Sequence, residues 1–188
     1  MSSAAFSYRS YLVPGRDCGD CVACCVQPAI EEADFHKPIG ATCQHCTGNG
    51  CGIYESRPLV CRAYHCGWRS MPNLDESWRP DLSGVMISWD IGRPDSGPSH
   101  AVKILITGDP AVLETDRFLG LVGRFIANRV STMLSVPRGP GYLNTSLILN
   151  ASLAPAIAAR DRAKARAFLR AAYAEMMKVP PELARTSA

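Results

Sequence analysis

Neither a membrane-spanning stretch nor a secretion signal is visible in this sequence of 188 residues. Its longest apolar stretches, such as Ile104–Ile106, are far shorter than the roughly 20 residues that a transmembrane helix requires. Residues 1–13 carry Arg9 and two tyrosines and contain no apolar core of the kind found in signal peptides. We therefore expect a cytoplasmic protein with no membrane partner.

Lysine is scarce, and positive charge is not concentrated in any segment. Lysines occur only at positions 37, 103, 164 and 178, the arginines are dispersed, and the net charge is +3. Nucleic-acid-binding domains usually carry a stronger and more clustered positive charge, so no nucleic-acid partner is expected. P-loop, dinucleotide-binding, nucleophile-elbow and H-E-x-x-H motifs are also missing, which leaves the most recognisable enzyme classes without support.

Cysteine, by contrast, is abundant in the first third of the chain and does not occur after position 66. In a reducing cytoplasm, such a cluster binds metal or acts chemically and seldom forms structural disulfides. The odd number also prevents complete pairing. The predicted metal ligands are all nine cysteines: Cys18, Cys21, Cys24, Cys25, Cys43, Cys46, Cys51, Cys61 and Cys66.

The spacing of these cysteines favours a thiolate-bound metal centre. The run from Cys18 to Cys24 has the two-residue spacing of a ferredoxin-type cluster loop, and Cys43-x2-Cys46 resembles half of a zinc ribbon. The predicted cofactor is therefore an iron–sulfur cluster or zinc, and the closely spaced thiolates favour iron–sulfur.

Cys24 and Cys25 are adjacent, and neighbouring side chains usually point apart. Cys24 continues the two-residue rhythm and is expected to bind beside Cys21, whereas Cys25 is expected to face a second site or to pack in apolar surroundings. Candidate partners for Cys25 are Cys51, Cys61 and Cys66. Two tetrathiolate sites would use eight of the cysteines, whereas one cluster would use four and leave five free thiols. The sequence leaves both arrangements open.

The fold class expected is α+β. Residues 1–80 are predicted to form a loop-rich cysteine metal-binding region, docked on a small antiparallel sheet with two helices in residues 81–188, so that both parts form one compact unit. Strands are predicted over 85–89, 102–107, 132–136 and 142–149, with loops at 92–99 and 137–141. Helices are predicted over 109–128 and 155–177, and a short helix after Pro58 is expected to contain Cys61. If Cys61 lies near the N-terminal end of that helix, the helix dipole should lower the pKa of its thiol.

A longer pattern surrounds the cysteines. The run Cys18–Cys25 is followed by the string Gly50-Cys51-Gly52-Ile53-Tyr54-x2-Arg57-Pro58-x2-Cys61-Arg62. This combination resembles the CxxCxxCC family of zinc- or iron-chelating bacterial proteins, also called the YkgJ cysteine-cluster family, over residues 18–69. The resemblance implies metal chelation and no particular reaction. Some larger proteins with a related cluster are flagellin lysine methylases, but this sequence shows no comparable extra domain, so that activity is not expected here.

Two kinds of function follow from these observations. The first is a metal-binding protein with a metal-handling, redox-sensing or partner-organising role, whose partners are a metal ion and, in the last case, another protein. The second is a metalloenzyme that uses the cluster or a spare thiolate for redox or group-transfer chemistry. A closed tetrathiolate site would favour the first, and an open coordination position beside a pocket would favour the second.

Overall fold

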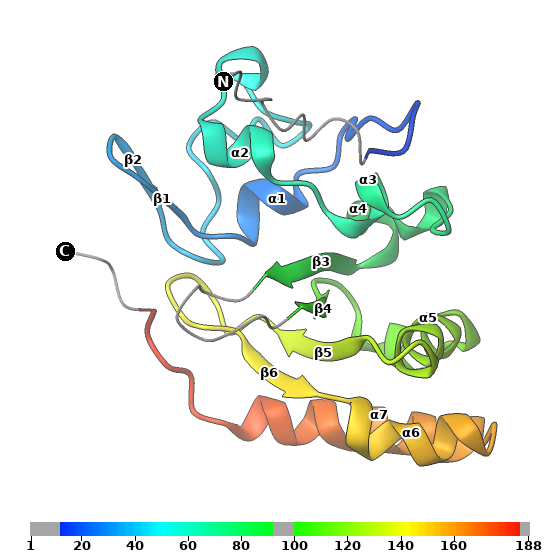
Figure 1. Cartoon of the computed structure of the whole chain (residues 1–188). Helices are drawn as coiled ribbons and strands as arrows, with labels where there is room; N and C mark the ends of the chain where they lie inside the picture. The colour runs from blue at the N-terminus through cyan, green and yellow to red at the C-terminus, as the bar shows by residue number, and fades with distance from the viewer. Residues whose placement is uncertain (1–11, 92–99, 185–188) are drawn as a thin grey trace, which may run out of the picture.

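The computed structural model describes residues 12–91 and 100–184 (Figure 1). It combines helices with a two-stranded and a four-stranded sheet, which confirms the α+β class. The loop predicted at 92–99 lies outside the described residues. Within them, no helix is long and apolar enough to cross a bilayer.

The larger sheet has the strand order β3-β4-β5-β6. Its strands are β3 (Val85–Ile91), β4 (His100–Ile106), β5 (Ser131–Val136) and β6 (Thr145–Ile148). The β3–β4 and β5–β6 pairs are antiparallel as predicted, but β4 and β5 are parallel, with Ile104 opposite Leu134. The sheet is therefore mixed, because a helical segment carries the chain back before β5 begins.

Both long helices predicted from the sequence are interrupted. The first is divided into η5 (Pro110–Glu114) and α5 (Asp116–Ala127), because the Thr115 hydroxyl accepts a hydrogen bond from the Phe118 amide and starts a new helix. The second is divided into α6 (Asn150–Ala158) and α7 (Arg162–Lys178). Between them Arg160 adopts a positive φ of 55°, and the Asp161 carboxylate caps α7 at the Lys164 amide.

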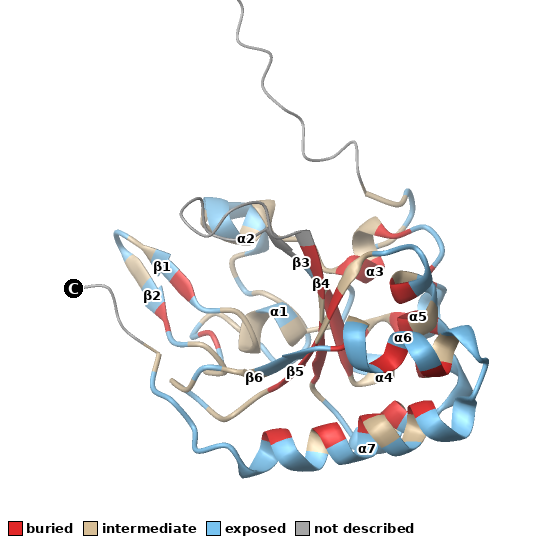
Figure 2. Cartoon of the chain, turned by 60° about the horizontal axis from the view of Figure 1, so that its bottom comes forward, coloured by how far each residue is buried: buried red, intermediate tan, exposed pale blue. Residues whose placement is uncertain are grey.

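The hydrophobic core lies between the sheet and helices α5, α6 and α7. Alternate side chains of β3 and β4, including Val85, Ile87 and Ile104, enter this core together with Leu121 and Leu169 of the helices. Figure 2 shows the buried residues along the sheet and on the inner surface of α7. Because side chains alternate along a strand, the intervening residues of β3 face the other side of the sheet.

The cysteine-rich region covers that other side, and in Figure 1 it lies across β3 from α6 and α7. Its elements are α1 (Ala23–Val26), β1 (Ile30–Glu32), β2 (Phe35–Lys37), η2 (Tyr54–Ser56) and α2 (Leu59–Ala63). They are followed by α3 (Gly67–Ser70), η3 (Glu76–Trp78) and α4 (Pro80–Ser83). The short helix containing Cys61 is thus present, as predicted.

The chain passes from the cysteine side to the core side at Gly67. A Cβ atom at this position would lie 2.7 Å from Cγ2 of Ile87, so only glycine permits this approach to β3. Immediately afterwards, Trp68, Met71 and Leu74 enter the hydrophobic core. Residues just after the last cysteine therefore pack with the sheet.

The segment after α7 folds back and is hydrogen-bonded to earlier parts of the chain. The Leu143 amide donates to the Glu182 carbonyl, and the Ala184 amide donates to the Gly141 carbonyl. Arg138, in the predicted 137–141 loop, donates to the Met177 and Val179 carbonyls and so caps the end of α7.

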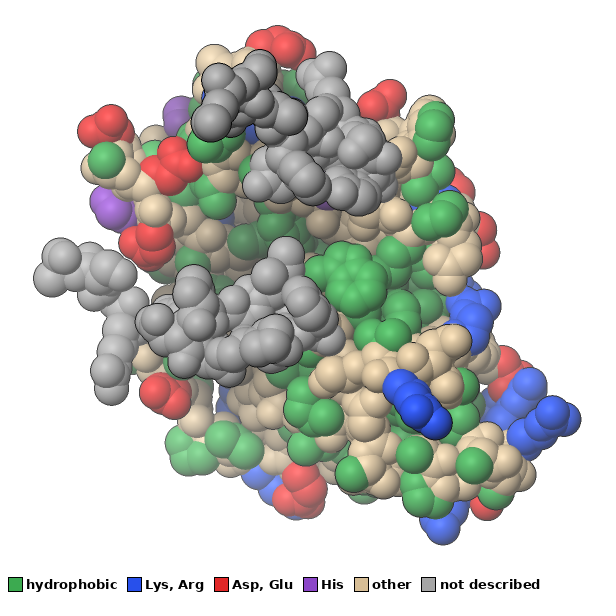
Figure 3. Space-filling model, viewed as in Figure 1, with side chains coloured by type: hydrophobic (Ala, Val, Ile, Leu, Met, Phe, Trp, Pro, Cys, Tyr) green, Lys and Arg blue, Asp and Glu red, His purple; other side chains and the backbone are tan. Residues whose placement is uncertain are grey.

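Figure 3 shows the molecular face on which apolar side chains gather over β3, the strand that carries the exposed Trp89.

Candidate metal centre

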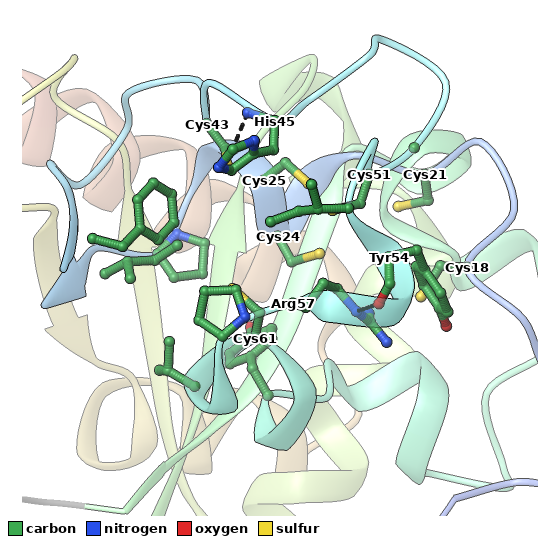
Figure 4. Close-up of a pocket in the computed structure, with 18 of the residues that line it drawn as sticks. Cys18, Cys21, Cys24, Cys25, Cys43, His45, Cys51, Tyr54, Arg57 and Cys61 are labelled. Atoms are coloured by element: carbon green, nitrogen blue, oxygen red, sulfur yellow. Dashed lines mark hydrogen bonds between the residues drawn. The ribbon is translucent and has the colours of Figure 1, made fainter. Parts of the chain in front are cut away.

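All nine cysteines lie in the described residues, and none forms a disulfide. Seven of them surround a cavity of about 340 Å³, which we call the thiol cavity (Figure 4). These seven are Cys18, Cys21, Cys24, Cys25, Cys43, Cys51 and Cys61. Its other walls include the apolar side chains Ile30, Phe35, Ile53 and Val60. The fold thus gathers thiols that are up to 43 positions apart in the sequence.

Cys66 lies in a smaller adjoining cavity of about 60 Å³, which we call the side cavity. Cys18, Cys21, Cys24 and Cys61 line both cavities. Met86 of β3 forms part of the side cavity, which places the thiols directly against the sheet. Cys46 does not line either cavity, and its backbone pairs with that of Cys51 in an isolated antiparallel β-bridge.

The two C-x2-C runs form the same kind of tight turn. The Cys21 amide donates to the Cys18 carbonyl over 3.0 Å, and the Cys46 amide donates to the Cys43 carbonyl over 3.0 Å. In the second turn, the His45 amide also points at Sγ of Cys43, 3.4 Å away. Amide donors to sulfur are a common means of stabilising thiolate ligands.

Cys24 and Cys25 occupy successive positions of α1 and have different surroundings. Burial raises the pKa of the Cys24 thiol, and charge repulsion from Cys25, Cys18, Cys21 and Cys66 raises it further. The side chain remains exposed because it faces the water-accessible cavity. Burial also raises the pKa of Cys25 to about 11, and there the repelling thiols are Cys46, Cys51 and Cys43.

Cys61 lies in α2, as predicted, but at its middle. Burial and the nearby Cys43 and Cys51 raise the pKa of its thiol, although the Arg57 guanidinium partly offsets them. A lowering of this pKa by the helix dipole is expected only for a position near the start of the helix, and in the five-residue α2 that condition is not met. A helix this short provides little dipole to oppose burial.

Lys37 is a charged residue of the site that sequence reasoning missed. It is 3% exposed, and its ammonium donates to the carbonyls of Val26 and Ala41, each 2.9 Å away, and to that of Pro38. Burial lowers the pKa of Lys37, whereas Cys43 and Cys25 act in the opposite direction. A buried cation beside thiols is suited to balance thiolate charge. No sequence signal indicated Lys37, because a single lysine between two turns belongs to no recognisable motif.

Asp81 and Arg79 are a second missed pair. The Arg79 guanidinium forms two hydrogen bonds to the Asp81 carboxylate, of 2.7 and 2.9 Å. The same carboxylate accepts a hydrogen bond from the Cys21 thiol, and burial raises the pKa of Cys21 to about 11. Asp81 is 60 positions from Cys21, so only the fold reveals the contact.

Tyr54 and Arg57 stand together at the rim of the thiol cavity. The Arg57 guanidinium lies 3.5 Å from the centre of the Tyr54 ring, and its Nε donates to the Tyr54 carbonyl. Of the histidines near the cysteines, His45 lines the thiol cavity and His65 lines the side cavity. His36 instead pairs with Glu31 on the surface.

The donor chemistry fits a thiophilic metal, but the sulfurs surround a volume and do not converge on a point. Within residues 12–91 and 100–184, no three or more Cys, His, Asp or Glu side chains form a ready site for a single ion. Zinc bound by four thiolates would need sulfurs about 3.8 Å apart, given Zn–S bonds of about 2.3 Å.

Comparison of the chain with family models, curated proteins and solved structures gave no match. The resemblance to the cysteine-cluster family therefore rests on the motif alone.

Proposed function

We propose that this is a cytoplasmic metal-binding protein whose cysteine region holds an iron–sulfur cluster, with zinc as the second candidate. The observation that supports this most is the cavity of about 340 Å³ whose lining includes seven unpaired cysteines. Metal handling, redox sensing and the organisation of a protein partner are all compatible with such a centre. The buried Lys37 ammonium beside Cys25 and Cys43 adds electrostatic support for bound thiolates.

The test is elemental and spectroscopic analysis of the full chain purified without oxygen and then reconstituted with iron and sulfide. We expect stoichiometric iron and acid-labile sulfide, with the broad visible absorption of a thiolate-bound cluster. A matched control is the variant with Cys24, Cys25, Cys43 and Cys51 all replaced by serine, which should bind no more metal than a buffer blank. Absence of both iron and zinc from the reconstituted wild-type chain would refute the proposal. Colourless protein with tightly bound zinc would replace the cluster by zinc.

A metalloenzyme is the alternative, and one observation favours it. The thiol cavity extends beyond the cysteines to the apolar wall of Ile30, Phe35 and Ile53, with Arg57 at the rim. A purely structural centre has no need of such adjoining space. Cyanide added to the loaded protein distinguishes the two, because an open coordination position would bind it and change the visible spectrum. An unchanged spectrum would indicate a closed centre.

A further inference from the structure

We propose that the cysteine region builds two separate metal centres that meet at α1. Cys18, Cys21, Cys24 and Cys66 form the first set of ligands, and Cys25, Cys43, Cys46 and Cys51 form the second. The inference rests on the proposed function, since it assigns the ligands of the metal that function requires.

The division begins at α1, where Cys24 and Cys25 are consecutive. Successive residues of an α-helix point about 100° apart, so the two thiols face different sides of α1. Cys24 lines the side cavity together with Cys18, Cys21 and Cys66. Cys25 does not line that cavity and lines the thiol cavity with Cys43 and Cys51.

The second set is formed by one continuous loop that docks on α1. The Cys43 amide donates to the Cys25 carbonyl over 2.8 Å, which fixes the start of the loop beside α1. The loop then folds back on itself. The backbones of Cys46 and Cys51 pair in an isolated β-bridge, and the Gly52 amide donates to the His45 carbonyl. In Figure 4, Cys25 lies beside Cys51, whereas Cys18 and Cys21 lie at the opposite side of the cavity from Cys43.

The first set is joined through the start of α3. Arg69, three residues after Cys66, donates to the Arg16 carbonyl and to the Asp17 carboxylate, so Cys66 is held beside the turn that begins at Cys18. These four thiols line the side cavity, which none of the second set lines. Cys61 adjoins both sets at the wall that the two cavities share.

The charged groups differ in the same way. The main thiol neighbours of Lys37 are Cys43 and Cys25 of the second set, and it also interacts with Cys61 and Cys24. Asp81, which is paired with Arg79, interacts with Cys21 of the first set. Two centres held by separate backbone segments should lose their metal independently.

Metal counts on single and double variants of the full chain, purified and reconstituted without oxygen, test this independence. Cys66→Ser and Cys46→Ser should each lose about half of the bound metal. Combining Cys66→Ser with Cys21→Ser, within one set, should cause no further loss. Combining Cys66→Ser with Cys46→Ser, across the sets, should remove nearly all of it. Cys18→Ser and Cys43→Ser replace the first pair if either variant fails to fold.

The proposal is overturned if either single variant loses all metal, or if the cross-set double variant loses no more than a single variant. Either result would mean that the two sets of cysteines bind one shared centre. A wild-type chain that binds no metal would refute the proposed function instead, so the two failures are distinguishable.

Discussion

Lys37 places an ammonium group inside the cysteine region, where it joins the end of α1 to the loop before Cys43 by donating to three backbone carbonyls. Replacing it by methionine keeps the length of the side chain but leaves those carbonyls without their donor. We expect Lys37→Met to lower the free energy of unfolding by about 1.5–3 kcal/mol, the usual contribution of a hydrogen bond to a charged group. Urea unfolding of the metal-loaded protein measures this.

Lys178→Met is the matched control, because Lys178 is exposed and forms a surface ion pair with Glu175. It should change the stability by less than about 0.5 kcal/mol. Equal effects of the two substitutions would show that the three carbonyls are satisfied without Lys37. At this scale the sequence indicated the nine thiols, but not Lys37 or Asp81, since neither belongs to a spaced pattern and both reach the cysteines only through the fold.

Helix α3 depends on the absence of a side chain at Gly67. A methyl group there would meet Cγ2 and Cβ of Ile87 at 2.7 and 2.9 Å, so either α3 or β3 must move. We expect Gly67→Ala to destabilise the protein by about 1–3 kcal/mol, as is typical of overpacking, and to weaken metal binding because it displaces the neighbouring Cys66. Thermal unfolding and metal content are the readouts.

Gly120 provides the control for this element. It is exposed within α5, and a Cβ there would meet nothing within 4 Å. Gly120→Ala should therefore leave metal content unchanged and stabilise the protein by about 0.5–1 kcal/mol through its better helix propensity. Unaltered stability in Gly67→Ala would contradict the tight α3–β3 contact.

Local patterns predicted most strands but not how the elements join. Alternating apolar residues were sufficient to predict β3, β4 and β5, because the alternation of apolar and polar side chains is visible within each strand's own sequence. The parallel β4–β5 pairing was missed, since tertiary packing decides whether two adjacent strands run parallel or antiparallel. The breaks at Thr115 and Arg160 were missed because helix propensity continues across them. Only the caps at Thr115 and Asp161 mark the new helix starts.

For the whole molecule, the position of the core predicts an uneven response to metal loss. The hydrophobic cluster contains Trp68, Met71, Leu74 and Trp78 together with the sheet and its helices, but no cysteine except the partly buried Cys66 at its margin. Removing the metal should therefore loosen residues 17–66 while the sheet stays folded, since a thiolate centre stabilises mainly the segment that supplies its ligands.

Hydrogen exchange before and after chelation tests this expectation. Amides of 17–66 should exchange faster, and those of β4 and β5 should keep their protection. The same measurement locates the boundary between the two parts, predicted near residue 80 from the sequence. Protection retained by residues 68–78 would move that boundary to the end of the cysteine cluster. Loss of protection throughout the chain would mean that the two parts unfold together.

Arg16 has a consequence for how the cysteine region regains its metal. Its guanidinium donates to the carbonyls of Trp68, Met71 and Leu74, and the Val13 amide donates to the Arg69 carbonyl, so both ends of the intervening chain are fixed on the core. Closing a flexible loop of about 50 residues costs roughly 3–4 kcal/mol of chain entropy. Because these hydrogen bonds involve no cysteine, they would hold the loop closed after metal has left. The thiols of an emptied protein would remain at high effective concentration around one another, and reloading would be an intramolecular assembly on a folded base.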